Sequence, residues 1–266
     1  MWIKELFGVD KPIIAMCHLQ PMPGDPHYDA QGGMDKVVEY ARRDLHALQD
    51  GGVDGVMFSN EFSMPYLTKV LPETVAAMSR VIGELKSEIK IPHGANCLWD
   101  PIASLDVAAA TSAYYIREIM SGVYASDFGL WDTNAGATAR HRKRICADNI
   151  KLLFNIVPEA AVYLAERDIV KVAQSTVFNH GPDALCVSGL TAGVATDTQI
   201  LSNVKKAVGD TPIFCNTGCN KDNIAIQLAA SDGAVVATTF KVEGKFKNPV
   251  DKKRVAEFMD AVKQTR

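Results

Sequence analysis

Short apolar runs alternate with amphipathic stretches along the whole chain. Runs such as PIIAMCH (12–18) and VDGVMFS (53–59) have the length and apolar content of buried strands. The stretch 34–51 instead repeats apolar residues at helical spacing and ends at Gly51 and Gly52, which are typical helix-terminating residues. The pattern therefore predicts strands that alternate with helices.

Continued to the end of the chain, the same pattern predicts eight strands. They cover 12–18, 53–59, 91–97, 114–119, 150–156, 183–189, 212–215 and 233–241. Helices are expected at 34–51, 72–88, from about 100, 135–148, 168–179, 196–208 and from about 220, and an irregular loop at 120–132. Short connections between alternating elements favour parallel strands with right-handed crossovers.

This count predicts an α/β fold, a single (β/α)₈ TIM barrel that occupies residues 1–266, because such barrels have about 250 residues. An open doubly wound sheet is the alternative architecture. It would be expected to carry a GxGxxG turn after its first strand, and HLQPMPGDP (18–26) has no such pattern.

The segment TPIFCNTG (211–218), followed by CNKDNIAIQLAA, indicates a phosphate-binding site. It predicts a buried strand, a turn at Gly218 and a helix that starts near Asn220. Backbone amides at such a helix start bind anions without a basic side chain. The next strand ends in Thr238, Thr239 and Lys241, so we expect the phosphate at the loops after strands seven and eight, as in many barrels.

Composition and charge restrict the class of partner and the location. The formal net charge is −3, which does not suggest nucleic acid or an acidic membrane as a partner. The sequence shows no signal peptide and no apolar run long enough for a membrane span, so we expect a cytoplasmic protein. Apolar Trp2, Leu6 and Phe7 either form a contact surface of a homo-oligomer or pack under the N-terminal end of the barrel.

The six cysteines indicate a reducing compartment, because most of them fall in predicted strands, where they behave as small buried hydrophobes. Cys215 and Cys219 have no second pair and no nearby histidine, which argues against structural zinc.

Barrel enzymes place their chemistry at the C-terminal ends of the strands, and His18 is there the best acid or base. A histidine that only binds a loop carbonyl is the equal alternative. Cys17 should point to the opposite face of the strand, so the two should not form a nucleophile and base pair. Glu61 and Asp127 are the carboxylates we expect to assist catalysis. Converging carboxylates also suit a divalent cation, so the metal requirement stays open.

Arg117 lies within predicted strand four, where a charge needs either a carboxylate partner or a substrate. Lys241 could contact phosphate or, less favourably, form a Schiff base. His93 is early in strand three and should be structural. Further substrate-binding candidates are the polar strand-end residues Asn60, Asn96, Asp100, Asn155, Ser188 and Thr191, and the phosphate-binding candidates are Gly193, Asn216, Gly218, Thr238 and Thr239.

Segments such as MCHLQPMPGDP, GVYASDFG and DALCVSGLTAG resemble the BtpA/SgcQ family in the same order along nearly the whole chain, with the SgcQ-like branch more similar. The resemblance implies a phosphate-binding (β/α)₈ barrel and leaves the reaction open. The family motif falls here on His18, Pro23, Gly24, Asn60, Asn96, Asp100, Asp127, Gly129, Ser188, Gly189, Gly193, Gly218, Thr238 and Lys241.

Three positions depart from the family pattern and indicate a different substrate from that of the founding branch. Ala237 is at a position where many relatives have glycine. Residues 59–63 are SNEFS, where the sequence ENFGD is common in the family. Residues 155–157 are Asn-Ile-Val, where relatives often have histidine and lysine.

Three functions fit these features. The first is an enzyme that acts on a sugar phosphate or nucleoside phosphate by isomerisation, carbon-carbon cleavage or hydrolysis. The second is a non-catalytic assembly factor, because the founding member of the family is associated with photosystem I biogenesis. The third is a binder of a phosphorylated effector without turnover.

Overall fold

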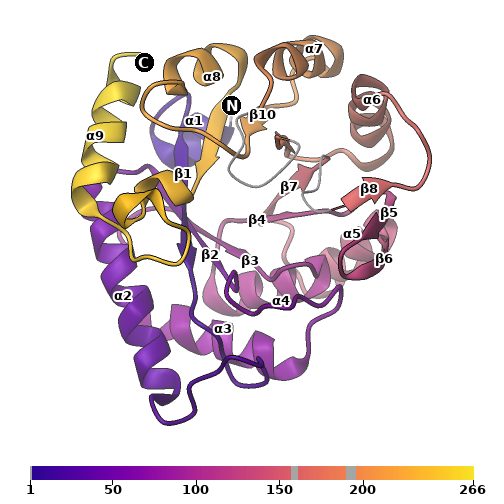
Figure 1. Cartoon of the computed structure of the whole chain (residues 1–266). Helices are drawn as coiled ribbons and strands as arrows, with labels where there is room; N and C mark the ends of the chain where they lie inside the picture. Colours follow the sequence, from indigo (N-terminus) through magenta and orange to yellow (C-terminus); the bar gives the residue numbers. More distant parts are fainter. Residues whose placement is uncertain (1, 157–160, 190–195) are drawn as a thin grey trace.

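Eight parallel strands close into a barrel in the computed structural model, which describes residues 2–156, 161–189 and 196–266. In barrel order the strands are β1 (Ile13–His18), β11 (Gly233–Val236), β10 (Ile213–Cys215), β9 (Ala184–Val187), β7 (Lys151–Asn155), β4 (Tyr115–Glu118), β3 (His93–Asn96) and β2 (Gly55–Ser59). The expected α/β barrel is therefore confirmed (Figure 1).

Helices surround the strands on the outside of the barrel (Figure 1). They are α2 (Gly33–Gly51), α3 (Pro72–Leu85), α4 (Pro101–Thr111), α5 (Ala135–Arg144), α6 (Ile169–His180), α7 (Thr198–Val208), α8 (Ile224–Ala230) and α9 (Lys252–Lys263). The described part of the chain contains no helix that is both long and apolar enough to cross a membrane.

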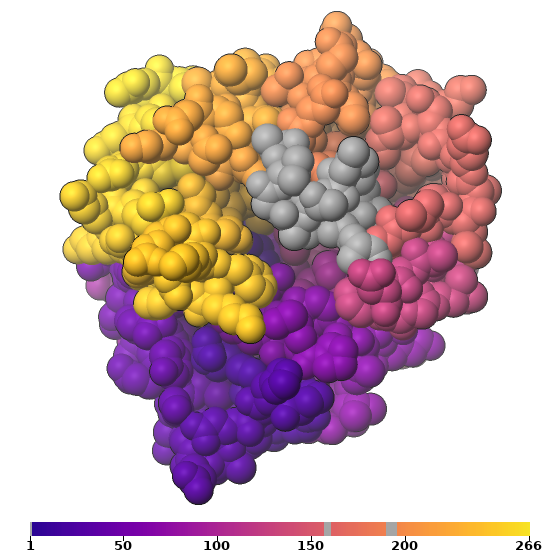
Figure 2. Space-filling model, in the orientation of Figure 1, coloured from indigo at the N-terminus to yellow at the C-terminus, as the bar shows by residue number. Residues whose placement is uncertain are grey.

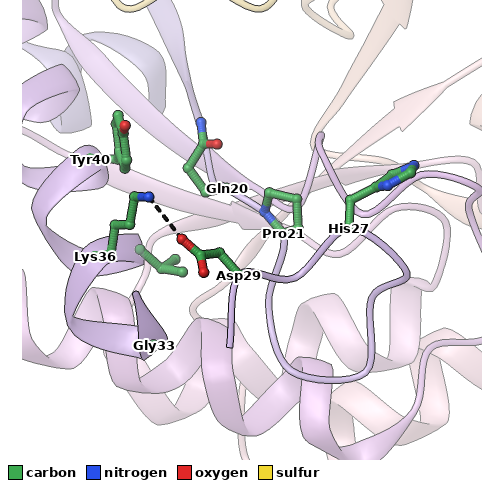
Figure 3. A pocket seen from close by; sticks show the side chains of 8 residues that line it. Gln20, Pro21, His27, Asp29, Gly33, Lys36 and Tyr40 are labelled. Carbon is green, nitrogen blue, oxygen red and sulfur yellow. Dashed lines mark hydrogen bonds and ion pairs between the residues drawn. The ribbon is translucent and has the colours of Figure 1, made fainter. Parts of the chain in front are cut away.

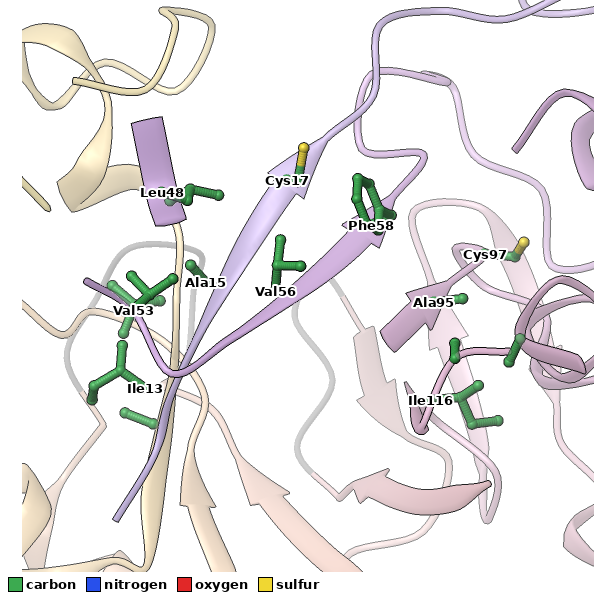
Figure 4. Packing of buried hydrophobic residues seen from close by; sticks show 14 of the residues in the cluster. Ile13, Ala15, Cys17, Leu48, Val53, Val56, Phe58, Ala95, Cys97 and Ile116 are labelled. Atoms are coloured by element: carbon green, nitrogen blue, oxygen red, sulfur yellow. The ribbon is translucent and has the colours of Figure 1, made fainter. Parts of the chain in front are cut away.

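The alternation of side chains along each strand creates two apolar layers. Ile13, Ala15 and Cys17 on β1 belong to the outer layer between strands and helices. Figure 4 shows Ile13 beside Val53, and Cys17 on the same side as Val56 and Phe58 of β2. Residues between these positions, such as Ile14 and Met16, belong to a second layer inside the barrel. The expectation that Cys17 and His18 point to opposite faces is confirmed, since the Cys17 thiol lies 3.7 Å from the carbonyl oxygen of Ala41 in α2.

The N-terminal helix α1 (Trp2–Phe7) packs against the inner layer of the barrel. Ile3 is buried in that layer, and Trp2, Leu6 and Phe7 pack against it. The Phe7 ring lies 5.7 Å from the ring of Tyr115 on β4. Of the two interpretations of these apolar residues, packing under the barrel is therefore the one the structure supports.

The segment 120–132 is not an irregular loop, as the sequence pattern had suggested. It forms a hairpin of β5 (Val123–Ser126) and β6 (Gly129–Asp132), which β8 (Ala161–Tyr163) extends to a three-stranded antiparallel sheet. Buried Tyr124 pairs with buried Trp131 across the hairpin, and Tyr124 also pairs with Tyr163. Packing of these aromatic side chains gives the hairpin a hydrophobic face, which a short strand pair needs for stability.

The last barrel strand is shorter than expected, because β11 ends at Val236 and the chain turns into the 3₁₀ helices η1 (Thr238–Phe240) and η2 (Val242–Gly244). The expected helix near Asn220 also begins later, at Ile224, after a turn in which the Asn220 side chain accepts hydrogen bonds from the amides of Asp222 and Asn223. Both differences bear on the predicted phosphate site.

Candidate active site

A ring of polar side chains lines the inside of the barrel at its C-terminal mouth. Each lies two residues after an inward-facing residue of the same strand, and the strand alternation therefore directs it inward as well. Buried His18 follows Met16, Ser59 follows Met57, and Asn155 follows Leu153. The whole ring consists of His18, Ser59, Asn96, Arg117, Asn155, Ser188 and Asn216.

Hydrogen bonds connect this ring across the barrel. The Arg117 guanidinium donates to the side-chain oxygens of Asn216 and Asn96, at 2.8 and 2.7 Å. Asn216 donates to the Ser188 hydroxyl at 2.7 Å, and that hydroxyl lies 3.4 Å from the side-chain oxygen of Asn155. The structure thus brings together five of the expected substrate-binding or phosphate-binding residues.

Asn96 connects the ring to a buried carboxyl group. Its side-chain nitrogen donates to Glu118, which also accepts from the Ser104 hydroxyl and from the amide of Ile119, at 3.3 Å each. Burial raises the pKa of Glu118 well above its usual value, against the lowering effect of Arg117. Glu118 therefore favours its neutral form. The sequence places it at the end of strand four beside Arg117, but we did not include it among the predicted site residues.

His18 is buried, and among the described residues its Nδ1 has no hydrogen-bond partner. Burial, and then the charges of Lys241 and Arg117, lower the pKa of His18 well below its usual value. His18 is therefore neutral at physiological pH and can accept a proton. The alternative that it binds a loop carbonyl does not hold for the described residues.

Glu61 lies next to His18, with Oε2 3.9 Å from His18 Nε2. The Ser59 hydroxyl donates to the same oxygen at 3.2 Å. Burial raises the pKa of Glu61 although Arg117 and the Ser59 hydrogen bond lower it. The two groups are too far apart for a direct hydrogen bond but close enough to act on one substrate hydroxyl or water.

Two phenylalanine rings enclose His18, and sequence reasoning missed both. Phe62 contacts the imidazole edge to face, with ring centroids 5.8 Å apart, and Phe246 lies 5.5 Å away. The two phenyl rings are 5.2 Å apart. Figure 2 shows the yellow segment after β11 against the purple segments of the first units on this face. These rings exclude water from the imidazole.

Asn60 and Asp100 are occupied by backbone hydrogen bonds. The Asn60 side-chain oxygen accepts from the amide of Leu98 at 2.7 Å. Asp100 caps α4 by accepting from Ile102 and Ala103, and it also accepts from Val70 at 3.2 Å. Their contact with a substrate stays a prediction.

Asp127 lies apart from the other predicted catalytic groups. It is exposed in the two-residue turn between β5 and β6, and within the described ranges no hydrogen bond or ion pair joins it to His18 or Glu61. Its predicted catalytic role therefore receives no support from this geometry.

The predicted phosphate site is described in part. Gly218 has a φ of 69°, so its turn needs a residue without a side chain, and the Thr217 hydroxyl accepts from the amide of Gly189 at 2.7 Å. Thr238 and Thr239 lie in η1, directly after Ala237. Thr191 and Gly193 lie outside the described residues.

The ammonium of Lys241 is held in a buried ion pair and is not free to contact phosphate, contrary to the sequence-based expectation, although its charge acts on His18. Because the chain turns away after Val236, Lys241 is buried against α2, where its Nζ lies 3.2 Å from Asp44 Oδ2. A lysine held in this ion pair is unsuited to form a Schiff base. Early in β3, His93 contacts the carbonyl oxygen of Thr111 at 3.3 Å, and burial lowers its pKa to about 4.

No cluster of three potential metal ligands occurs among the residues described here. The Sγ atoms of Cys215 and Cys219 lie 3.3 Å apart in the core behind the Gly218 turn.

A surface groove beside the start of α2 contains Lys36, but its ammonium binds Asp29 at 2.8 Å (Figure 3). That groove therefore offers no unpaired cation for an anionic ligand.

Comparisons with known proteins agree with the architecture. The model of the BtpA family matches residues 9–264. The chain is 61% identical to the sgc region protein SgcQ of Escherichia coli K12, with 100% of this chain and 99% of SgcQ covered. It is 29% identical to the photosystem I biogenesis protein BtpA of Synechocystis, with 98% and 91% covered.

Two solved structures illustrate the fold. A geranylgeranylglyceryl phosphate synthase from Thermoplasma acidophilum, in complex with its substrate sn-glycerol-1-phosphate, matches with a TM-score of 0.63, 14% identity and coverage of 98% and 97%. An archaeal fructose 1,6-bisphosphate aldolase matches with a TM-score of 0.58, 15% identity and coverage of 98% and 97%.

Proposed function

This chain belongs to the BtpA family, and we propose that it is an enzyme acting on a phosphorylated small metabolite at the C-terminal mouth of the barrel. The observation that carries the proposal is the pair of His18 and Glu61 at 3.9 Å, at the ring of buried polar side chains. A neutral imidazole beside a carboxyl of raised pKa is suited to move protons. The substrate is a sugar phosphate or a nucleoside phosphate.

His18 accepts a proton from the substrate, and Glu61 in its protonated form donates one or orients the reacting hydroxyl. Phe62 and Phe246 keep water from the imidazole, which strengthens its interaction with charge that develops on the substrate. This division of roles suits isomerisation, carbon-carbon cleavage and hydrolysis alike. Asp127 remains a proposed contributor only if the hairpin that carries it approaches the substrate.

We place the substrate phosphate at the loops after β10 and β11. Gly218 and Asn216 supply the first loop, and Thr238 and Thr239 supply hydroxyl donors from the second. The two solved structures named above support a phosphorylated substrate, because both are named for phosphorylated compounds. The free cysteines are consistent with our proposal of a cytoplasmic enzyme.

The test is turnover of sugar phosphates and nucleoside phosphates, followed by NMR, with and without Mg²⁺. Once a substrate is found, His18→Asn and Glu61→Gln should each lower kcat by about 10² to 10⁴, as expected for groups that transfer protons. His27→Asn is the control, because His27 is an exposed histidine. Unchanged kcat in both site variants would refute the assignment.

An assembly function is the second candidate, because one relative is a photosystem I biogenesis protein. In that case the barrel would be a scaffold, and a protein partner would co-purify in stoichiometric amounts. Tight binding of a phosphorylated ligand without any product would instead indicate a non-catalytic binder.

A further inference from the structure

Arg117 brings a positive charge into the barrel, and within the described ranges it has no carboxylate partner. Only 9% of the residue is exposed, and its two recorded hydrogen bonds go to the neutral side chains of Asn96 and Asn216. Throughout residues 2–156, 161–189 and 196–266, no carboxylate forms an ion pair with it. A buried charge is costly unless it is paired, so this position calls for an anion.

The donors of Arg117 are only partly used. A guanidinium has five N–H donors, and the hydrogen bonds to Asn96 and Asn216 account for two of them. The neighbouring carboxyls compensate its charge poorly, because burial raises the pKa of both Glu61 and Glu118 despite the opposing effect of Arg117. The planar group can therefore bind an additional oxyanion through a two-pronged contact.

The position of Arg117 separates this anion from the phosphate. β4 is four strands from β11 in the order around the eight-stranded barrel, which is directly opposite. Arg117 reaches inward from β4 to the side chain of Asn216 and so lies on the floor of the mouth. Gly218, Thr238 and Thr239 of the proposed phosphate loops instead follow the ends of β10 and β11 and form the rim. A small substrate held by its phosphate at the rim would present its other end to the floor.

Uncharged polar side chains lie between Arg117 and the proposed phosphate loops. Ser59, Asn155 and Ser188 contribute hydroxyl and amide groups, which match the hydroxyls of a polyol chain. They carry no charge that would compete for the anion at Arg117.

Building on the proposed function, we infer that Arg117 binds a carboxylate of the substrate, which makes the substrate class a phosphorylated hydroxy acid such as a phosphorylated sugar acid. The carboxylate occupies the floor of the mouth, the phosphate its rim, and the hydroxyl chain passes His18 and Glu61. Arg117 thereby determines specificity for acids over the corresponding alcohols.

Isothermal titration with matched ligand pairs tests this inference. 6-Phosphogluconate and glucitol 6-phosphate differ only in carboxylate against hydroxymethyl, as do 3-phosphoglycerate and glycerol 3-phosphate. The wild-type protein should bind the acid of at least one pair about tenfold or more tightly than the alcohol, because a hydrogen bond to a charged group contributes about 1.5–3 kcal/mol. Arg117→Gln should abolish the preference and change the affinity for the alcohol by less than about threefold.

Two further variants serve as controls. Arg117→Lys keeps the charge and should retain part of the preference, and Arg80→Gln removes an arginine on α3 that pairs with Glu84 and should behave as wild type. If Arg117→Gln does not fold, the inference is still tested by whether the wild-type protein prefers the acid to the alcohol within each pair.

The outcomes separate the inference from the proposed function. Equal binding of acid and alcohol by the wild type overturns the carboxylate site but leaves a phosphate ligand. Loss of both alcohol and inorganic phosphate binding in Arg117→Gln shows that Arg117 holds the phosphate, and this also overturns the inference. Binding of gluconate through Arg117 without any contribution from phosphate would keep the carboxylate site and refute the phosphorylated substrate. Failure of every acid to bind counts against the carboxylate site.

Discussion

His18 shows how its surroundings determine what a single residue can do. Exposed on a loop, a histidine would be partly protonated near pH 6.5, but burial beside Lys241 and Arg117 keeps His18 neutral. The same burial that prepares it as a base also reduces the stability of the protein in acid.

The first prediction concerns this acid sensitivity. The pKa of His18 is lowered on folding, so the unfolded chain takes up the proton first, and stability that is present above about pH 6.5 is lost as the pH falls. Relative to His18→Asn, the wild type should lose up to about 2 kcal/mol of unfolding free energy between pH 7.5 and pH 5. Urea unfolding measures this, with His27→Asn as the control. An equal pH dependence of wild type and His18→Asn would contradict it.

Glu61 is predicted to reduce stability at neutral pH. Its pKa is raised on folding, so ionisation in the folded state is costly above the unfolded pKa of about 4.3. Glu61→Gln should therefore raise the unfolding free energy at pH 7.5 by about 1 kcal/mol while it lowers kcat, and the gain should vanish near pH 4. Glu39→Gln, on an exposed part of α2, is the control. A loss of stability at pH 7.5 would refute the argument.

At the residue scale, the sequence predicted the polar residues of the barrel mouth better than the phenylalanine side chains that cover His18. His18, Asn96, Arg117 and Asn216 could be found because the end of each strand is visible in the apolar pattern. Phe246 could not, because nothing local indicates that a loop near the C-terminus folds over the end of the first strand. The sequence also could not show that Arg117 forms no ion pair with any described residue.

Among the elements, the two ends of the loop 241–250 are held together by one carboxylate. Asp44 of α2 binds Lys241 at one end of the loop and the amide of Val250 at the other, at 3.2 Å each. Val242 and Pro249 are also joined by a backbone hydrogen bond of 2.8 Å. Asp44 thus closes the loop and positions Phe246 against His18.

Asp44→Asn should release this loop. It leaves the buried charge of Lys241 unpaired, which should cost about 3–5 kcal/mol and increase amide hydrogen exchange across 241–250. Asp50→Asn is the matched control, because Asp50 lies on α2 like Asp44 but pairs with Lys252 of α9 on the surface. This substitution should cost less than about 1 kcal/mol. Equal effects of the two variants would show that Asp44 does not close the loop.

Asp100 has two proposed roles that one pair of variants can separate. Asparagine caps a helix about as well as aspartate, so Asp100→Asn should leave stability nearly unchanged, while Asp100→Ala should cost about 1 kcal/mol. Ligand titration then reports the second role. If Asp100→Asn weakens ligand binding without loss of stability, Asp100 contacts the substrate as well as capping α4.

Elements were predictable where their apolar pattern was long and regular. α2 and β1 were expected nearly at their observed bounds, because the terminating glycines and the apolar run are unambiguous. The hairpin of β5 and β6 was missed, because Tyr124 and Trp131 within it are stabilised together with Tyr163, which lies on β8 in a later segment of the chain. β11 was predicted too long, since the continued apolar and threonine run gives no sign of the turn at Ala237.

For the whole molecule, the barrel places a half-buried carboxyl, a buried imidazole, an arginine with no ion pair among the described residues, and a glycine turn at one mouth. The central claim is that a phosphorylated metabolite binds there. Thermal unfolding of the wild-type protein with sugar phosphates and with the corresponding unphosphorylated sugars tests it most directly. A phosphorylated ligand at one hundred times its Kd should add about 2.7 kcal/mol, which raises Tm by several degrees, whereas its unphosphorylated counterpart should have little effect. If no phosphorylated compound stabilises the protein more than its counterpart does, the account is wrong.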